Sequence, residues 1–283
     1  MINRREFLER TGAALAFGAF GVRSPGVPAP PAPRPESLSR IGVELYTVRH
    51  LMDESVERTL AQVARIGYKE VEFAGYFRKT PLEIRAILDA NGLTSPSAHS
   101  ADLPSIRNGF ARVLEAATII GHTTVICASL PSAEETVDGY KRAAREFNQA
   151  GEAAAQAGLA FGFHNHEEEF KPLGSTNGYD VLLAECDPKL VKMQLDLFWT
   201  VKGGKDPLAY FAKYPGRFTS VHVKDMAADG AMVDVGAGRL PFAKYFAQSK
   251  EAGIRHYFVE HDQPPDPMAS IAASYKYLSG LTF

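Results

Sequence analysis

The chain has no large excess of charge of either sign, and it has few cysteines. Its 283 residues carry a formal net charge of -2 at pH 7, which gives no electrostatic reason to expect binding to nucleic acid or to an anionic membrane. The two cysteines, Cys127 and Cys186, fall in different expected elements, form no metal-type spacing and give no support for a disulfide. We therefore expect neither a nucleic-acid partner nor a cysteine metal site.

A long hydrophobic run is also missing. The segment TGAALAFGAFGV at residues 11–22 is shorter than the roughly 20 residues that span a bilayer comfortably. It follows the pair Arg4-Arg5 and precedes a proline-rich stretch at 23–35, an order that resembles a twin-arginine export signal. Residues 1–36 are thus expected to be a signal and linker, which implies a periplasmic protein with no stable membrane association after export. The alternative is a tail with a chance arginine pair.

From Arg40 onward, short β-type runs alternate with helix-length segments, which is typical of repeated βα units around a parallel sheet. Eight strands are expected, at 41–46, 70–73, 93–99, 124–128, 159–164, 191–196, 219–223 and 256–260. Eight helical segments are expected between and after them, at 55–66, 81–91, 104–120, 133–157, 178–186, 207–214, 241–252 and 268–278.

Glycine and proline mark several of these boundaries. Gly67 and Gly121 follow expected helices, where a left-handed residue often ends the helix, and Pro81 and Pro207 stand at first helical positions. The pattern predicts an α/β fold, a single (β/α)8 TIM barrel over residues 37–283. The alternative is a doubly wound open sheet, but the first strand is followed by no Gly-rich phosphate turn.

Polar side chains stand at the ends of seven of the eight expected strands. In such barrels the active site lies at the carboxyl ends of the strands. An unpartnered buried polar group costs about 1–3 kcal/mol, so seven of them on one rim require a common partner, such as a divalent metal with a polyhydroxylated substrate. For Glu44, Glu72 and His99 the alternative is a purely structural role in hydrogen bonding. The seven are Glu44, Glu72, His99, His164, Asp196, His222 and Glu260.

The segment LAFGFHNHEEEF at 159–170 carries the densest group of such side chains. Because alternate residues of a strand share a face, His164 and His166 point the same way beyond an apolar run. Two imidazoles at the end of a buried strand suit metal binding or proton transfer.

Several separated motifs resemble the xylose isomerase-like barrels, also called the sugar phosphate isomerase/epimerase superfamily. They are FHNHEEEF, LDLFW, GGKDPLAYF, YPGRF, HVKD, VGAG and FVEHD. The likeness runs from Ile41 to Gly280, and this combination of motifs resembles a branch of the superfamily whose members are exported. The resemblance implies a divalent ion such as Mn2+, Zn2+, Co2+ or Mg2+ on four side chains from strands five to eight. By position these are His164, Asp196, His222 and Glu260.

The strand-five position departs from the epimerases of this superfamily, which usually carry a glutamate there and use it with the strand-eight glutamate as an acid/base pair. Here that position is His164. The candidate proton-transfer groups are therefore Glu260, His166 and Glu72, with Glu169 as a further candidate. Glu168 is an alternative metal ligand.

Other polar or aromatic residues near these motifs have expected supporting roles. Lys224, two residues past His222, is expected to neutralise an oxyanion, and Asp225 to orient His222 or Lys224. Trp199 offers a platform for a sugar face or packs in the core. Glu44 and His99 are expected to contact substrate.

The expected activity is that of a metal-dependent isomerase or epimerase acting on a keto sugar or related polyol through an enediolate. The alternative is a lyase that expels a β-substituent from a 3-keto-glycoside or keto-inositol. An endonuclease should show a basic groove, which the net charge of -2 disfavours, and a sugar-binding protein needs no cluster of bases. No feature of the sequence indicates an oligomeric state.

Overall fold

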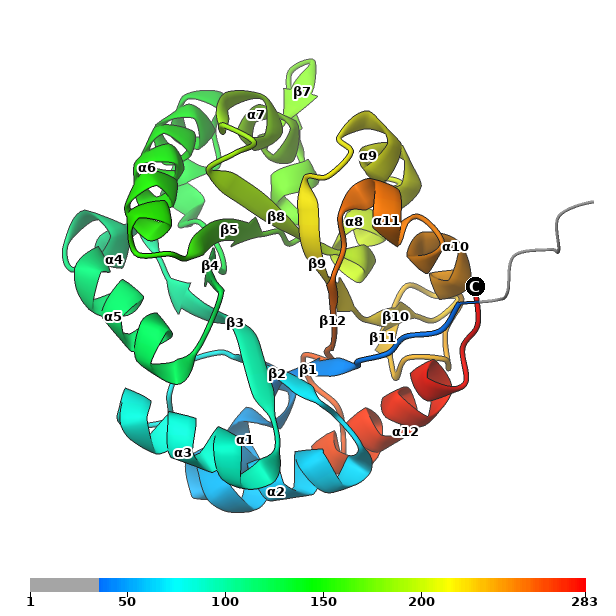
Figure 1. The fold of residues 1–283 in the computed structure, drawn as a ribbon. Coiled ribbons are helices and arrows are strands. Elements are labelled where there is room, and N and C mark those ends of the chain that lie inside the picture. Colours follow the sequence, from blue (N-terminus) through cyan, green and yellow to red (C-terminus); the bar gives the residue numbers. More distant parts are fainter. Residues whose placement is uncertain (1–35) are drawn as a thin grey trace, which may run out of the picture. The chain divides into compact units, whose positions relative to one another are not determined.

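The computed structural model describes residues 36–283, and the expected export signal falls outside them. Eight parallel strands form one closed barrel in the order β1-β12-β9-β8-β5-β4-β3-β2, which confirms the predicted (β/α)8 fold (Figure 1). The strands are β1 Gly42–Glu44, β2 Glu70–Phe73, β3 Thr94–Ala101, β4 Thr124–Cys127, β5 Ala160–His164, β8 Val191–Asp196, β9 Phe218–Val223 and β12 His256–Val259.

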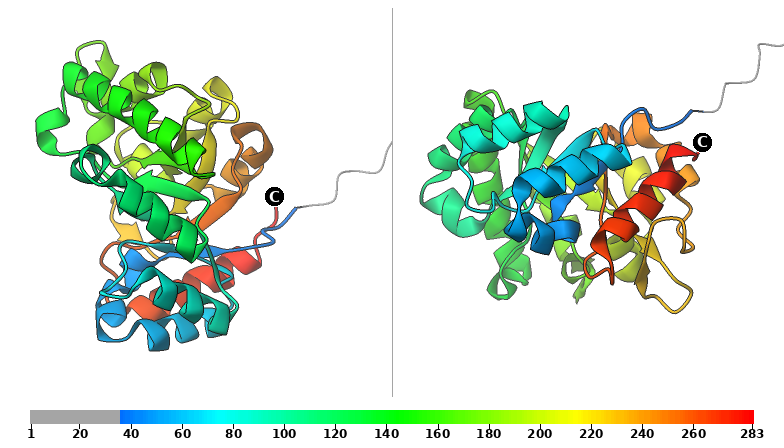
Figure 2. Two further views of the ribbon diagram at one scale, coloured as in Figure 1. Left: turned by 60° about the vertical axis from the view of Figure 1, so that its left-hand side comes forward. Right: turned by 90° about the horizontal axis from the view of Figure 1, so that it is seen from below.

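Helices surround the barrel on its outside (Figures 1 and 2). The longer ones are α2 Val56–Ile66, α3 Pro81–Asn91, α5 Phe110–Ile120, α6 Val137–Gln156, α7 Gly178–Glu185, α9 Pro207–Lys213 and α12 Pro267–Ser279. The shorter ones are α1 Arg49–Glu54, α4 Leu103–Arg107, α8 Leu197–Lys202, α10 Phe242–Phe246 and α11 Ser249–Ala252, with 3-10 turns η1 Leu45–Val48, η2 Ser132–Glu134 and η3 Glu168–Phe170. None of the helices between residues 36 and 283 is both long and apolar enough to cross a bilayer.

Local sequence explains why α3 begins and ends where predicted. Thr80 and Glu83 form a capping box at its first turn, so two backbone amides without helical partners are satisfied. Pro81 occupies the first helical position, and Gly92 ends the helix with a φ of 62°.

Two expected helices are each divided in the structure. The segment 104–120 becomes α4 and α5 because Gly109 adopts a φ of 117°, a conformation outside the helical range. The segment 241–252 becomes α10 and α11, and between them the Gln248 amide donates to the Tyr245 carbonyl in a tighter turn. Both corrections affect outer helices and leave the strand order unchanged.

Two small hairpins follow the carboxyl ends of β5 and β9. They consist of β6 Pro172–Leu173 with β7 Thr176–Asn177, and β10 Asp225–Met226 with β11 Met232–Val233. The hairpins thus lie at the strand ends where an active site is expected.

The first and last described residues lie side by side. The backbone of Glu36 exchanges hydrogen bonds of 2.8 and 3.0 Å with Phe283, and α12 packs beside α2 (Figure 1).

Candidate active site

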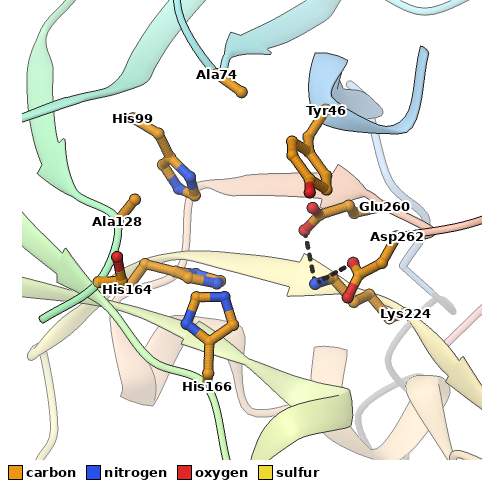
Figure 3. A pocket seen from close by; sticks show the side chains of 10 residues that line it. Tyr46, Ala74, His99, Ala128, His164, His166, Lys224, Glu260 and Asp262 are labelled. Atoms are coloured by element: carbon orange, nitrogen blue, oxygen red, sulfur yellow. Dashed lines mark ion pairs between the residues drawn. The ribbon is translucent and has the colours of Figure 1, made fainter. Parts of the chain in front are cut away.

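A cavity of about 350 Å³ opens at the carboxyl ends of the strands. Five residues predicted for the site line it: His99, His164, His166, Lys224 and Glu260. In Figure 3 the three histidines stand on one side, and Tyr46, Glu260, Lys224 and Asp262 stand on the other. The cavity therefore lies between an imidazole wall and a wall of carboxylates with one ammonium group.

His222 on β9 is fully buried between two carboxylates. Its Nδ1 lies 2.6 Å from Glu260 Oε2, and its Nε2 lies 2.6 Å from Glu72 Oε2. Burial disfavours the charged ring, but the contacts with Glu260 and Glu72 outweigh burial and raise the pKa of His222 to about 9. Without a metal, His222 is thus protonated at neutral pH.

Glu72 on β2 is held from several sides and does not line the cavity. Ser97 and Gln194 donate hydrogen bonds to its carboxylate, the latter over 2.9 Å. Burial opposes ionisation, yet His99 and His222 lower the pKa of Glu72 to about 2. The structure thus places Glu72 behind His222, where its carboxylate contacts Nε2 of the ring and leaves Nδ1 toward Glu260, and not in the cavity lining where a group that transfers a proton with substrate was expected.

Glu72→Gln is expected to weaken divalent-metal binding by about 10–100-fold, as loss of a carboxylate behind a metal-binding imidazole generally does. A glutamine amide cannot hold the His222 Nε2 proton as the carboxylate does. Titration calorimetry with Zn2+ measures the effect. The matched control is Ser97→Ala, which removes a neighbour of Glu72 and leaves its contact with His222. Equal affinities in Glu72→Gln and wild type would rule out this role.

Lys224, only 1% exposed, is surrounded by three carboxylates. Its Nζ lies 3.2 Å from Asp196 Oδ2, 2.9 Å from Glu260 Oε2 and 2.8 Å from Asp262 Oδ1 (Figure 3 draws the last two). Burial disfavours the ammonium, but these three charges outweigh it and raise the pKa of Lys224 well above its usual range. Lys224 therefore holds its proton firmly and supplies a fixed positive charge at the cavity.

The residues present fit a divalent ion. Asp196, His222 and Glu260 offer ligand atoms that lie within 4.8 Å of one another, and His164 forms a similar group with His99 and His222. In this set, His164 Nδ1 is buried and has no hydrogen-bond partner among the described residues, and the Lys224 ammonium is the close neighbour of buried Asp196 Oδ2, at 3.2 Å. A mixed set of imidazole nitrogens and carboxylate oxygens suits Mn2+, Zn2+ or Co2+.

His166 continues the imidazole wall beyond β5. Burial first, and then the charge of Lys224, lower its pKa to about 4, so its ring is neutral at pH 7. Glu169 Oε2 accepts a hydrogen bond of 2.7 Å from the His166 amide and thereby fixes the loop. Glu169 and Glu168 were alternative candidates for proton transfer and metal binding, but neither lines the cavity, and Glu168 pairs with Lys171 at 3.7 Å.

Glu169→Gln is expected to make the protein less sensitive to alkaline pH. Burial raises the pKa of Glu169 to about 7, so the folded state binds its proton more tightly than the unfolded state, and stability is lost as pH rises through this range. Glutamine keeps an oxygen for the His166 amide and carries no charge. The unfolding free energy of the Glu169→Gln variant, compared with that of the wild type, should therefore rise by about 2–3 kcal/mol from pH 5 to pH 8, measured by urea titration. A difference that does not change with pH would contradict this.

The carboxylate of Asp225 does not contact the residues that its predicted role requires. Its Oδ1 accepts hydrogen bonds from the amides of Met226 and Leu240, at 2.8 and 3.1 Å, and its Oδ2 accepts from those of Gly236 and Gly238, both at 2.9 Å. Its carboxylate thus organises the loop after β11 and does not orient His222 or Lys224 as expected.

Trp199 and Glu44 are also outside the cavity lining. The Trp199 amide donates to Asp196 Oδ1 over 2.8 Å, and its ring centroid lies 5.6 Å from Lys224 Nζ, so the indole packs behind the ammonium. Glu44 is buried and accepts a hydrogen bond of 3.2 Å from the Tyr46 amide. Burial, with the charges of the neighbouring glutamates, raises the pKa of Glu44 well above its usual range. Both residues support the site from outside.

Sequence reasoning missed a second set of polar residues that support the first. Gln194 donates to Glu72 through Nε2, and its Oε1 accepts a hydrogen bond of 2.7 Å from His99 Nε2; Ser220 also accepts from Gln194 Nε2. Asp262 pairs with Lys224. A signal was present: Gln194, Ser220 and Ser97 each stand two residues before a predicted site residue, and Asp262 stands two after one. Residues two apart on a strand share a face, so they stack in layers inside the barrel.

Fold and site together define a class of protein, a (β/α)8 enzyme whose histidines and carboxylates meet at the carboxyl ends of the strands. The chain belongs to the xylose isomerase-like TIM barrel family, whose sequence profile matches residues 60–279. Proteins with this fold include isomerases, epimerases and inosose dehydratases.

Similar proteins of both kinds are known. The inosose dehydratase of Lacticaseibacillus casei is 22% identical over 264 residues, which cover 78% of this chain and 88% of that protein. The structure of a sugar phosphate isomerase/epimerase from Parabacteroides distasonis is 25% identical, with a TM-score of 0.77, covering 85% of this chain and 93% of the other. The 3-keto-D-glucoside 4-epimerase of E. coli shares the fold, with a TM-score of 0.61 at 18% identity over 80% of this chain and 94% of that one.

Proposed function

We propose that the protein is a metal-dependent isomerase or epimerase that moves a proton next to the carbonyl of a keto sugar or related polyol. The observation that carries the proposal is the pair of opposed walls: His166 with His99 and His164 on one side, and Glu260 with Lys224 on the other (Figure 3). A proton taken by a group on one wall and returned from the other would change the configuration of the carbon between them.

The metal ligands in this proposal are Asp196, His222 and Glu260, with His164 as the fourth. A divalent ion held there would polarise the carbonyl and lower the pKa of the proton beside it. Glu72 keeps the His222 ring oriented for this purpose through the contact at Nε2.

The proton steps use the chain's own side chains. A base removes the proton on carbon, the C–H electrons form the enediolate, and a proton returned to either carbon completes isomerisation or epimerisation. His166 is the base on one wall because its ring faces the cavity and makes no side-chain hydrogen bond among residues 36–283. Glu260 acts from the other wall. Lys224 stabilises the negative oxygen with its fixed charge.

A second function shares these steps. If a β-substituent leaves from the enediolate, the C–O bond breaks, an enone forms and the departing oxygen takes a proton, which is elimination. Two observations favour this candidate: His164 stands where an epimerase glutamate is expected, and the curated relatives are inosose dehydratases. The firmly held proton of Lys224 favours charge stabilisation over donation to a leaving group, so isomerisation is the leading proposal.

The substrate in this proposal is unphosphorylated. Among the described residues that line the cavity, Lys224 is the one lysine or arginine, and three carboxylates already surround it. A phosphate would meet more negative than positive charge there, whereas neutral hydroxyl groups match the imidazoles and carboxylates.

The test is incubation of the Mn2+-supplemented protein with keto sugars, 3-keto-glycosides and keto-inositols in D2O, with products quenched, freed of metal and followed by NMR. Deuterium beside the carbonyl with the carbon skeleton and all substituents retained supports the isomerase or epimerase. A released substituent with a new enone supports the lyase instead. No exchange with any of these compounds would overturn both.

Export is a separate proposal, which rests on Arg4-Arg5 and the apolar segment that follows. Replacing both arginines by lysine should move the protein from the periplasmic to the cytoplasmic fraction of a host that has the twin-arginine pathway. Unchanged fractionation would contradict this.

A further inference from the structure

A second cavity, of about 450 Å³, adjoins the one at the site. The two cavities share three lining residues, His99, Ala128 and Ser129. One histidine and two consecutive residues after β4 therefore border both spaces, and the two cavities are called here the first and the second lobe of the site. The second lobe lies over the loops after β2, β3 and β4.

Small side chains stand at the border between the two lobes, after the end of β4. Each of the other seven barrel strands has a carboxylate or an imidazole at or near its carboxyl end, but β4 ends at Cys127 and is followed by Ala128. After β2, Ala74 is similarly small, and Figure 3 shows Ala74 and Ala128 on either side of His99 at the edge of the first lobe. The side chains at this edge of the first lobe are therefore small.

The lining of the second lobe is neutral or acidic and rich in hydroxyl groups. Ser100, Ser105 and Ser129 contribute hydroxyls, and Asp102 contributes the one carboxylate. Ser100 Oγ is buried, and the Tyr76 hydroxyl is its polar neighbour. No lysine or arginine of residues 36–283 lines this lobe. Such a surface suits an uncharged, polyhydroxylated group and disfavours an anion.

Tyr76 gives the second lobe a rigid aromatic side. Its hydroxyl lies 3.2 Å from His122 Nε2, and the two rings stack at 14°. The loop that carries Tyr76 has two consecutive residues with positive φ, Phe77 at 49° and Arg78 at 60°, and such residues cost about 1–3 kcal/mol each and gather at ligand sites. The loop is thus held in an unfavourable conformation that presents Tyr76 to the lobe.

We propose that the second lobe is a subsite for the second sugar ring of a glycoside whose keto ring occupies the first lobe. This inference rests on the proposed function for the chemistry at the first lobe. It narrows the substrate class to an uncharged keto-glycoside of at least two rings, because a single-ring sugar or inositol would fill only the first lobe.

Binding of methyl α-glucoside and trehalose tests the subsite apart from catalysis, since neither carries a ketone and they differ by one ring. Trp199, the one tryptophan of the chain, lies beside Lys224 and reports binding by fluorescence in the Mg2+-supplemented protein. Trehalose should bind at least about tenfold more tightly than methyl α-glucoside. Ala128→Leu should abolish this ratio by filling the border between the two lobes, and so should Ser129→Leu, at an exposed position where folding is not at risk.

The matched control is Ala86→Leu, on an exposed position of α3 that lines neither lobe, which should keep the wild-type ratio. Equal affinities for the two sugars, failure of trehalose to saturate the signal, or a ratio that survives in Ser129→Leu would each overturn the subsite. Failure of the proposed function has a different signature, which is absence of deuterium exchange while the ring preference remains.

Discussion

Glu260→Gln is expected to lower kcat by roughly 10²–10⁴-fold, the range that a positioned acid/base group contributes. Glu260 lines the cavity, lies 2.6 Å from His222 Nδ1 and 2.9 Å from Lys224 Nζ, and forms with Asp196 and His222 a group that could hold a metal ion. Glutamine is close in size but neither accepts a proton nor balances the two positive charges. Initial rates of deuterium incorporation measure the effect.

The matched control is Asp262→Asn. This substitution also removes one carboxylate from beside Lys224, since Asp262 Oδ1 lies 2.8 Å from Lys224 Nζ. Asp262 has no hydrogen bond with His222 and lies outside the groups that could hold a metal ion. Its variant should lose at most about tenfold, the effect of one partly exposed ion pair. If the two variants lose activity equally, the charge balance of Lys224 explains the loss, and the acid/base role of Glu260 is wrong.

The second large effect is the pH dependence of metal binding. Because the pKa of His222 is raised to about 9 in the metal-free protein, an ion must displace its proton at any lower pH. The association constant should therefore rise about tenfold for each pH unit between pH 6 and pH 8, and level off above about 9. Titration calorimetry in buffers of different ionisation enthalpy measures both the affinity and the proton released.

Buffer comparison gives this prediction an internal control, since the number of protons released must match the slope of affinity against pH. One proton per ion at pH 7 is expected. An affinity that does not vary between pH 6 and pH 8, with no proton release, would mean that His222 is not a ligand.

The barrel could be predicted because its signal is local. Strands β2 and β8 have the expected bounds because their apolar runs end at glycine, proline or charged residues. Eight successive βα repeats then favour one closed arrangement, the (β/α)8 barrel. The breaks within 104–120 and 241–252 could not be predicted as readily. A glycine such as Gly109 is compatible with a helix in sequence, and only the surrounding packing decides its φ of 117°.

The site could be predicted as a set of strand ends but not as a network. Alternation placed His99, His164 and Glu260 at one rim, and the structure brings them to one cavity. The sequence could not tell that Glu72 lies behind His222, because two residues on β2 and β9 meet only once the barrel closes. Asp225 follows Lys224 directly in sequence, but its carboxylate accepts from the amides of Gly236 and Gly238, a contact that forms only once the β10–β11 hairpin folds back.

Anomalous diffraction from crystals of the Mn2+-loaded protein tests the central claim most directly, that the polar cluster of this barrel is a metal centre for proton transfer. We expect one strong manganese peak in contact with Asp196, His222 and Glu260, at about 2.0–2.3 Å from their ligand atoms. Lys224 should remain beside the site. A peak elsewhere, or none at full Mn2+ saturation with the ion pairs of Lys224 intact, would contradict it.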